Sequence, residues 1–201
     1  MDIVTESVKK IEGMVDNCGC EEGDVILDTN PDKVNCQYEW GACMVASFGG
    51  KTAEFVTDNP IRARTRLEFM FGAPLDTPQA RVAAGSVINV LSAFFSLTRI
   101  HHACPAPSHM PCIELLVREI GGKRIKCTGK MPAIEAELRA YLVDTPGDAD
   151  ILLFNGEGLI ERGSGDLIAA YRDSKRIICL GPSTSGIARL HGLEHWCPFG
   201  T

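Results

Sequence analysis

The chain has 201 residues, of which 45% are hydrophobic and 23% charged, and its formal net charge at pH 7 is -6. This composition is sufficient for a folded core and argues against disorder, whereas the acidic balance argues against a nucleic-acid-binding protein. No apolar stretch reaches the roughly 18 residues needed to span a bilayer, and the first residues lack the basic start of a signal peptide. We therefore expect a cytoplasmic protein with neither a nucleic acid nor a membrane as partner.

The nine cysteines are scattered along the chain. Because the number is odd and the expected compartment is reducing, they indicate free thiols or metal ligands before disulfides. Cys18 and Cys20, with Cys36 and Cys43, form one thiolate set, but its spacing matches no standard zinc or iron-sulfur pattern.

The first 75 residues predict a small α+β unit. Apolar residues at helical spacing predict a helix over residues 3–15. Extended segments are predicted at 24–27, 35–39, 41–48 and 52–57, with Gly49-Gly50 joining the last two as a hairpin. Asn59-Pro60 and Gly72 predict a helix over 61–71. Arg62, Arg64 and Arg66 would then be spread around its exposed side.

A longer helix is predicted from Thr77-Pro78 to a point near Arg99, because its apolar residues share one side. Small residues at 83–86 suit close packing against neighbours. Asn89 lies among apolar positions, so we expect its amide either to cap a loop or to face a cleft. The stretch 101–111 contains three prolines and is the predicted connection between domains.

Beyond residue 108, helical and strand patterns alternate. Helices are predicted at 113–120, 132–142, 164–174 and 185–191, and strands at 124–128, 149–154, 176–180 and 195–198. Such alternation implies a parallel sheet with right-handed crossovers. The predicted fold class is therefore α/β: residues 1–75 form an α+β part, 76–107 a connecting helix and linker, and 108–201 a Rossmann-like domain.

Two of these buried strands run directly into glycine-rich polar turns, and in open α/β sheets such loops hold the ligand. In residues 181–186, the backbone and the hydroxyls of Ser183, Thr184 and Ser185 can converge on a phosphate or carboxylate. The alternative is that these residues only cap a short helix.

In the other loop, Gly156 and Gly158 follow Asn155 and let the backbone approach a ligand closely. Glu157 could serve there as an acid, a base or a hard metal ligand, or be an incidental glutamate of an exposed turn.

A third loop, Gly129-Lys130-Met131-Pro132, lacks both the dinucleotide fingerprint and the phosphate-loop motif, so no nicotinamide or nucleotide cofactor is expected. Lys130 could neutralise an anion there or simply be solvated.

Two His-x-x-Cys pairs lie in and beside the proline-rich stretch. Their spacing would let His101, Cys104, His109 and Cys112 bind one divalent transition metal. The alternative is a rigid linker with buried thiols.

Three segments of the chain are similar to the heavy-metal chelation domain family of uncharacterised prokaryotic proteins. Gly129-Lys130-Met131-Pro132 resembles its glycine-x-x-proline turn, Gly181-Pro182-Ser183-Thr184 its glycine-proline-serine-threonine signature, and residues 83–89 its small-residue helix ending in isoleucine-asparagine. Asn155 and its neighbours stand where a threonine-rich turn is expected. The resemblance implies an N-terminal part like the capping domain of enolases, and a cleft between the two parts that binds a metal or a metal-binding small molecule.

These patterns together predict a cleft that binds a small anionic or metal-chelating ligand, or a metal ion itself. One alternative is an enzyme acting on a small metabolite with Glu157 as acid or base, and another is a thiol and histidine metal carrier or sensor. A homo-oligomer is compatible with any of them. The expected ligand-binding residues are Asn89, Gly129, Lys130, Asn155, Gly156, Gly158, Gly181, Pro182, Ser183, Thr184 and Ser185.

Overall fold

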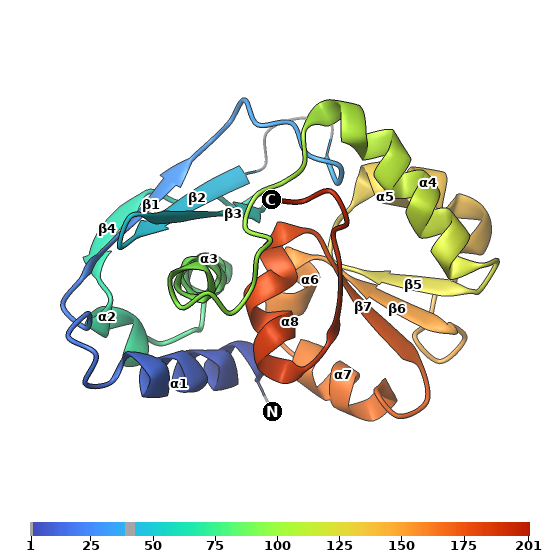
Figure 1. Cartoon of the computed structure of the whole chain (residues 1–201). Coiled ribbons are helices and arrows are strands. Elements are labelled where there is room, and N and C mark those ends of the chain that lie inside the picture. Colours follow the sequence, from blue (N-terminus) through green and yellow to red (C-terminus); the bar gives the residue numbers. More distant parts are fainter. Residues whose placement is uncertain (1, 39–42) are drawn as a thin grey trace.

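The computed structural model describes residues 2–38 and 43–201, and within them the chain forms two four-stranded sheets (Figure 1). The antiparallel sheet has the order β3-β2-β1-β4, with β1 at Asp24–Thr29, β2 at Cys43–Phe48, β3 at Lys51–Val56 and β4 at Ala63–Arg66. The parallel sheet has the order β5-β6-β7-β8, with β5 at Ile125–Thr128, β6 at Ile151–Phe154, β7 at Arg176–Leu180 and β8 at Glu194–Trp196. An α/β fold of two parts is therefore confirmed.

The N-terminal part begins with α1 (Ile3–Val15), whose first turn is capped by Asp2 through a 2.9 Å bond from the Thr5 amide. The predicted hairpin is also present: β2 and β3 pair antiparallel around Gly49 and Gly50. Both glycines have positive φ, at 54° and 76°, a backbone conformation that favours glycine. The helical periodicity and the Gly49-Gly50 pair were therefore sufficient to predict this helix and this hairpin.

The predicted helix over residues 61–71 is wrong. Its first half is the strand β4, which pairs with β1, and only Glu68–Phe71 is helical, as α2. Arginine stands at every second position from 62 to 66, which leaves this first half without an apolar stripe that a helix could bury, whereas the strand places Arg64 2.6 Å from Asp24 across the ladder. Arg62 likewise lies 2.9 Å from Asp28, so these arginines pair with acidic residues of β1.

The predicted strand over residues 35–39 is wrong for its described residues, since 35–38 belong to no strand and the chain bends at 36 and 37. The side chain of Asn35 accepts hydrogen bonds from the amides of Gln37 and Tyr38, which folds the backbone locally and leaves no ladder to join. Glu39 and the start of the predicted segment 41–48 lie outside the described residues.

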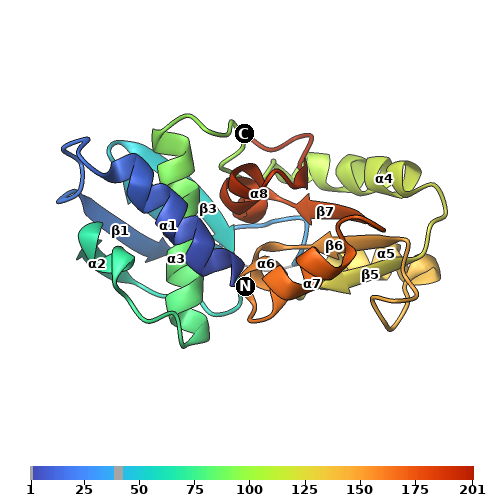
Figure 2. The ribbon, with the colours of Figure 1, turned by 90° about the horizontal axis from the view of Figure 1, so that it is seen from below.

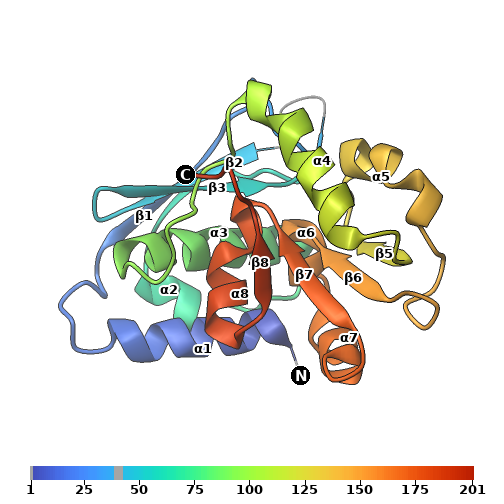
Figure 3. The ribbon, with the colours of Figure 1, turned by 45° about the vertical axis from the view of Figure 1, so that its right-hand side comes forward.

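The parallel sheet is covered on both faces (Figures 1 and 3). On one face lie α4 (His109–Ile120) and α5 (Pro132–Glu137), and on the other α6 (Gly156–Ile160), α7 (Ser164–Tyr171) and α8 (Ser185–His191). Single 3-10 turns stand at Ala106–Ser108, Arg139–Tyr141 and Pro182–Thr184. The alternation of strand and helix was thus predicted, although α4 begins four residues earlier than expected.

The helix α3 (Pro78–Phe94) lies at the centre of the molecule, between the antiparallel sheet and the helices α1 and α8 (Figure 1). One continuous hydrophobic core includes Phe55 of β3, Ile88 of α3, Phe154 of β6 and Ile187 of α8. A second core fills the far face of the parallel sheet beneath α4 and α5. The two parts therefore share one core, and α3 belongs to it.

Two further features fix the parts against each other. A Cβ on Gly85 of α3 would lie 2.8 Å from the ring of Phe55 and 3.1 Å from Ile160, so the small residue permits close packing. The helix α1 crosses beneath α3 and reaches α8, where the Ser7 hydroxyl lies 2.9 Å from Nε2 of His191 (Figure 2). The loops at this boundary thus rest on a packed scaffold.

Candidate functional site

A cavity of about 620 Å³ opens where the two parts meet. Its wall is formed by the chain after β3, the start of α3, the loop after β5, and α6 with the residues that follow it. Pro78, Val82 and Ile160 supply apolar surface, and charged side chains surround them. The remaining lining residues are Asp58, Asn59, Asp76, Arg81, Gly129, Lys130, Glu157, Glu161 and Arg162.

Glu157, in the first turn of α6, is held by donors from the other part of the molecule. Its Oε1 accepts hydrogen bonds from the Thr57 hydroxyl and the Asp58 amide, both at 2.8 Å, and its Oε2 accepts one from the Tyr38 hydroxyl at 2.9 Å. The carboxyl group therefore joins α6 to the chain on either side of β2 and β3. Three hydrogen-bond donors from the N-terminal part thus meet one carboxyl group of the C-terminal part at this wall.

Glu157 and Asp58 are placed in contrasting electrostatic environments. Burial raises the pKa of Glu157 above its ordinary value, even though three donors favour the ionised form. The ammonium group of Lys130, 2.6 Å away, is the main cause that lowers the pKa of Asp58, and the hydrogen bond shared with Glu157 acts in the same direction. The neighbouring carboxyl groups thus differ in proton affinity, as acid and base partners in enzymes do.

Tyr38 completes this arrangement. Its hydroxyl donates to Glu157, and burial, followed by the charge of Glu157, raises the pKa of the phenol. Tyr38 is therefore protonated at neutral pH and available as a donor.

Two ion pairs stand at the rim of the cavity. Lys130 pairs with Asp58, and Arg162 lies 2.8 Å from Asp76. The side chains of Lys130 and Arg162 are 71% and 63% exposed, so solvent and an incoming solute both reach them. Exposed pairs of this kind contribute little to stability.

The loop after β5 can approach α6 closely because both contain glycine. Gly129 has a φ of 87°, and a Cβ there would collide with the Asn155 side chain and the backbone of Gly158. A Cβ on Gly158 would in turn collide with the carbonyl group of Thr128. This backbone crossing brings Lys130 beside Glu157.

Asn155 is fully buried and supports the crossing from within. Its Oδ1 caps α6 by accepting from the Gly158 amide at 2.9 Å, and its Nδ2 donates to Gln37 and to the carbonyl of Lys130. All of these bonds are within the protein, and neither Asn155 nor Gly156 lines the cavity. The structure thus places Asn155 behind the site wall.

The loop at 181–186 lies deeper. The Ser183 hydroxyl accepts from the Val56 amide at 2.7 Å, and the Thr184 hydroxyl donates to the carbonyl of Gly181 at 2.9 Å. Ser185 is buried as well, and its hydroxyl has no hydrogen-bond partner among the residues that the structure describes. None of residues 181–186 lines the cavity, although an anion near them stays a prediction.

Asn89 of α3 binds that same loop. Its Nδ2 donates to the carbonyls of Pro182 and Ser183, and its Oδ1 accepts from the Gly186 amide at 3.0 Å. Of the two arrangements that the sequence left open for Asn89, the structure has the loop cap.

The structure does not assemble the predicted His/Cys quartet. His109 Nε2 lies 3.1 Å from the carbonyl oxygen of Cys104, and His101 Nδ1 lies 3.4 Å from the Thr98 hydroxyl. Across residues 2–38 and 43–201, no group of three or more His, Cys, Asp or Glu side chains is arranged to hold a metal ion. The ring nitrogens thus face other partners.

The cysteines gather in groups that their spacing did not predict. Burial first, with the proximity of Cys104 among the smaller causes, raises the pKa of Cys36, Cys112 and Cys197 to about 12, 11 and 12. Cys18 and Cys20 form a disulfide, so the expectation of free thiols is wrong for them. These two are bonded to each other and so offer no free thiolate to Cys36 and Cys43.

The fold that carries this site is an α/β fold of two parts, and comparisons show what it is similar to. No family model and no curated protein matches the sequence. A DUF364-family protein of unknown function from Pyrococcus horikoshii matches with a TM-score of 0.50 at 12% identity, over 90% of this chain and 79% of its own. A DUF364-family protein of unknown function from Desulfitobacterium hafniense gives 0.46 at 16% identity, over 94% and 84%. The likeness to the first supports the fold, and assigns no ligand.

No helix among the described residues is long and apolar enough to cross a membrane.

Three residues of the site have no signal in the sequence. Tyr38, Thr57 and Asp58 lie on loops of the N-terminal part and are separated from Glu157 by 119, 100 and 99 positions. Strand-end reasoning identified Gly129, Lys130 and Glu157, because their loops leave neighbouring parallel strands at one edge.

Proposed function

We propose that the cavity between the two parts binds a small organic ligand carrying an anionic or metal-chelating group. The carrying observation is the cavity itself, in which apolar surface from Val82 and Ile160 lies beside the exposed cations Lys130 and Arg162. Small-molecule sites generally combine a mostly apolar wall with a few polar groups that fix orientation.

The ion pairs at the rim favour an anionic group on the ligand. A carboxylate or phosphate that meets Lys130 can share its ammonium group with Asp58, because that group has three N–H donors and is largely exposed. Asp58 and Asp76 already have cationic partners, and Glu157 is satisfied by three donors, which limits the repulsion that four acidic side chains would exert.

The carboxyl groups supply the reason to include metal chelates. Asp58, Glu157 and Glu161 present hard oxygen donors to the cavity. Since no three acidic, histidine or cysteine side chains of the described chain are arranged around one metal position, the ligand itself must supply most of the coordination. A divalent metal would therefore enter as a chelate and contact the protein through one or two carboxylates.

Native mass spectrometry of freshly purified protein, together with elemental analysis, tests this proposal. We expect the native mass to exceed the mass of the chain by that of a small molecule or metal chelate. On activation in the spectrometer, this ligand should dissociate and leave the mass of the bare chain. Lys130→Met should weaken binding of that ligand about tenfold, as the loss of one charge-assisted contact does. Lys123→Met, on an exposed turn outside the cavity, is the control. The proposal fails if nothing co-purifies and no small carboxylate, phosphate or nickel, cobalt or zinc chelate binds.

A second candidate, an enzyme acting on the bound molecule, is favoured by the pairing of Glu157 with Asp58. A carboxyl group with a raised pKa beside one with a lowered pKa can donate a proton and then recover it. Glu157→Gln should abolish turnover of the identified ligand while leaving its affinity within a few-fold. Glu161→Gln, on the same wall, should retain turnover, and equal rates in the two variants would reject this role for Glu157.

A further inference from the structure

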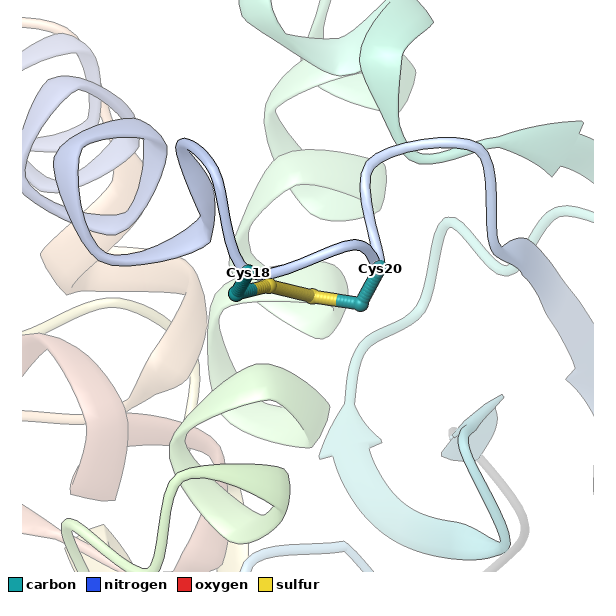
Figure 4. Close-up of a disulfide and its surroundings, with 2 residues drawn as sticks. All are labelled: Cys18 and Cys20. Carbon is teal, nitrogen blue, oxygen red and sulfur yellow. A yellow bond between two sulfur atoms is a disulfide. The ribbon is translucent and has the colours of Figure 1, made fainter.

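The segment between α1 and β1 carries the disulfide Cys18–Cys20, with 5.5 Å between the two Cα atoms (Figure 4). A disulfide stabilises a fold mainly by restricting the unfolded chain, and the effect grows with the length of the enclosed loop. This one encloses only Gly19 and joins no two elements of the fold. Stabilisation is therefore a poor explanation for it, and a chemical role is a better one.

The two sulfurs differ in their surroundings. Cys18 is exposed just beyond the end of α1, whereas Cys20 is partly buried and packs against the main core. Gly19 between them has a φ of 79°, and apart from its two chain neighbours no heavy atom of the described residues lies within 4 Å of the position a Cβ would take. The turn is therefore open at Gly19, and the exposed Cys18 is the residue of the pair that an attacking thiolate reaches more easily.

The charge along the chain around the pair is negative, and the arginines of the neighbouring strand β4, Arg64 and Arg66, are themselves paired with Asp24 and Glu68. Residues 11–32 contain no lysine, arginine or histidine, and the disulfide lies at the C-terminal, negative end of α1. Acidic side chains flank it on both sides: Glu12, Asp16, Glu21 and Glu22. Such surroundings disfavour thiolates, which makes the two sulfurs poor leaving groups and the reduced pair a good reductant.

We propose that Cys18 and Cys20 are a reversible dithiol–disulfide exchange site whose reaction partners are dithiols without a net negative charge. The site is separate from the cavity and does not depend on the function proposed for it. A dithiol suits the reaction because its second thiol completes the exchange within one encounter.

The exchange proceeds in two balanced steps. The thiolate of the dithiol attacks Sγ of Cys18, a mixed disulfide forms, and Cys20 leaves as a thiolate that takes up a proton. The second thiol of the reagent, once deprotonated, then attacks the reagent's own sulfur in the mixed disulfide and releases Cys18, which is protonated in turn. Two electrons and two protons pass to the protein, and the reagent becomes a disulfide.

Opening the disulfide should loosen a turn that contacts α2. The carbonyl of Cys20 accepts from the Gly23 amide, and the carbonyls of Glu21 and Gly23 accept from the amides of Glu68 and Leu67. Hydrogen exchange at the amides of Leu67 and Glu68 should therefore accelerate in the reduced protein.

The test uses the full chain purified without reductant, treated with dithiothreitol or with glutathione at equal thiol concentration, then alkylated and mapped by mass spectrometry. We expect Cys18 and Cys20 to be labelled together, and dithiothreitol to act at least about tenfold faster than anionic glutathione at low salt. Labelling of both residues before any reductant is added overturns the proposal. So does a disulfide that opens only after the protein is unfolded in urea.

Variants test the direction of attack and the role of charge. Of the pair, the thiol of Cys18 that remains in Cys20→Ser should react with an aromatic disulfide reagent at least about fivefold faster than the thiol of Cys20 that remains in Cys18→Ser, because Cys18 is the exposed one. Glu21→Gln with Glu22→Gln should speed reduction by glutathione several-fold, whereas Glu137→Gln with Asp173→Asn, exposed in the other part, should not. Equal rates within either comparison contradict the proposed site.

Discussion

The loop after β6 and the loop after β7 leave neighbouring parallel strands at the same edge of the sheet, yet their polar groups have different surroundings. Glu157, in the first, lies on the wall of the cavity. Ser183 and Thr184, in the second, are buried and bonded to the protein's own backbone. Each loop is held by one buried asparagine, Asn155 in the first and Asn89 of α3 in the second.

The difference shows what strand topology determines and what it leaves open. The carboxyl ends of parallel strands bring loops together at one edge. Whether a loop then meets solvent depends on the elements that pack over it, and here β3 and α3 cover residues 181–186. The loop at 155–158 meets the glycine-containing loop after β5 instead, and the space beside that crossing stays open.

The largest expected effect comes from placing a methyl group where the loop after β5 crosses α6. Gly129→Ala adds a Cβ that collides with Asn155 and with the backbone of Gly158, in a residue whose φ is already positive. We expect a loss of about 3 kcal/mol or more in the free energy of unfolding by urea. Gly122→Ala is the matched control, since its φ of 76° carries the same strain but its surroundings are open, and it should cost about 1 kcal/mol. Equal losses would mean that the crossing is not tight.

The next effect concerns the buried loop. Asn89→Ala leaves the Gly186 amide and the carbonyls of Pro182 and Ser183 without their partner, so we expect a loss of about 2–3 kcal/mol in unfolding free energy. Ser86→Ala, in the same helix, removes only a bond to the carbonyl of Val82 and should cost less than about 1 kcal/mol. A loss no greater than that of the control would show that Asn89 does not hold the loop.

Elements of the fold that depend on local interactions could be predicted from the sequence. The helix at residues 3–15, the Gly49-Gly50 hairpin and the alternating second half follow from local periodicity and turn chemistry, which act over a few residues. The segment at 61–71 shows the opposite case. Asn59-Pro60 is a local helix signal, but pairing with β1, more than 30 residues earlier, was the stronger influence, and no local pattern reports it.

The residues of the candidate site likewise include some that the sequence could predict and some that it could not. Glu157 and Lys130 could be predicted because each follows a strand of one sheet, whereas Tyr38 and Asp58 reach the wall through contacts between the two parts. Spacing was also a weak guide to the thiols, since the neighbours of Cys104 include Cys36 and Cys197 from opposite ends of the chain. Contacts of high sequence separation leave no periodic trace.

A smaller effect on stability distinguishes a structural role of Ser183, in the loop after β7, from a role in anion binding. Ser183→Ala removes the acceptor of the buried Val56 amide, so we expect a loss of about 1–2 kcal/mol in unfolding free energy with unchanged affinity for the cavity ligand. Ser185→Ala removes a hydroxyl that has no hydrogen-bond partner in the described part of the chain, and should be nearly neutral. A fall in ligand affinity with unchanged stability would instead assign Ser183 to a binding site.

The smallest effect is a change in how stability depends on pH, measured by urea unfolding of Glu157→Gln and the unchanged protein. Because the folded state raises the pKa of Glu157, the folded protein holds this proton over a range in which the unfolded chain has lost it. Its contribution to stability is thus present at acidic pH and is lost as pH rises from the ordinary glutamate value, 4.5, through the raised pKa. The variant, in which the amide can still accept from Thr57 and Asp58, should therefore gain stability relative to the unchanged protein across that window.

Glu161→Gln, on the same wall, reports any change that arises merely from removing a negative charge from the cavity, and that part is subtracted. The opposite trend, in which the unchanged protein gains on Glu157→Gln as pH rises, would mean that the three donors outweigh burial and lower the pKa of Glu157. Glu157 would then keep its charge to lower pH than an ordinary glutamate and serve as a fixed anchor between α6 and the N-terminal part. The same measurement thus decides whether the wall beside Lys130 contains a group able to exchange a proton or only a structural contact.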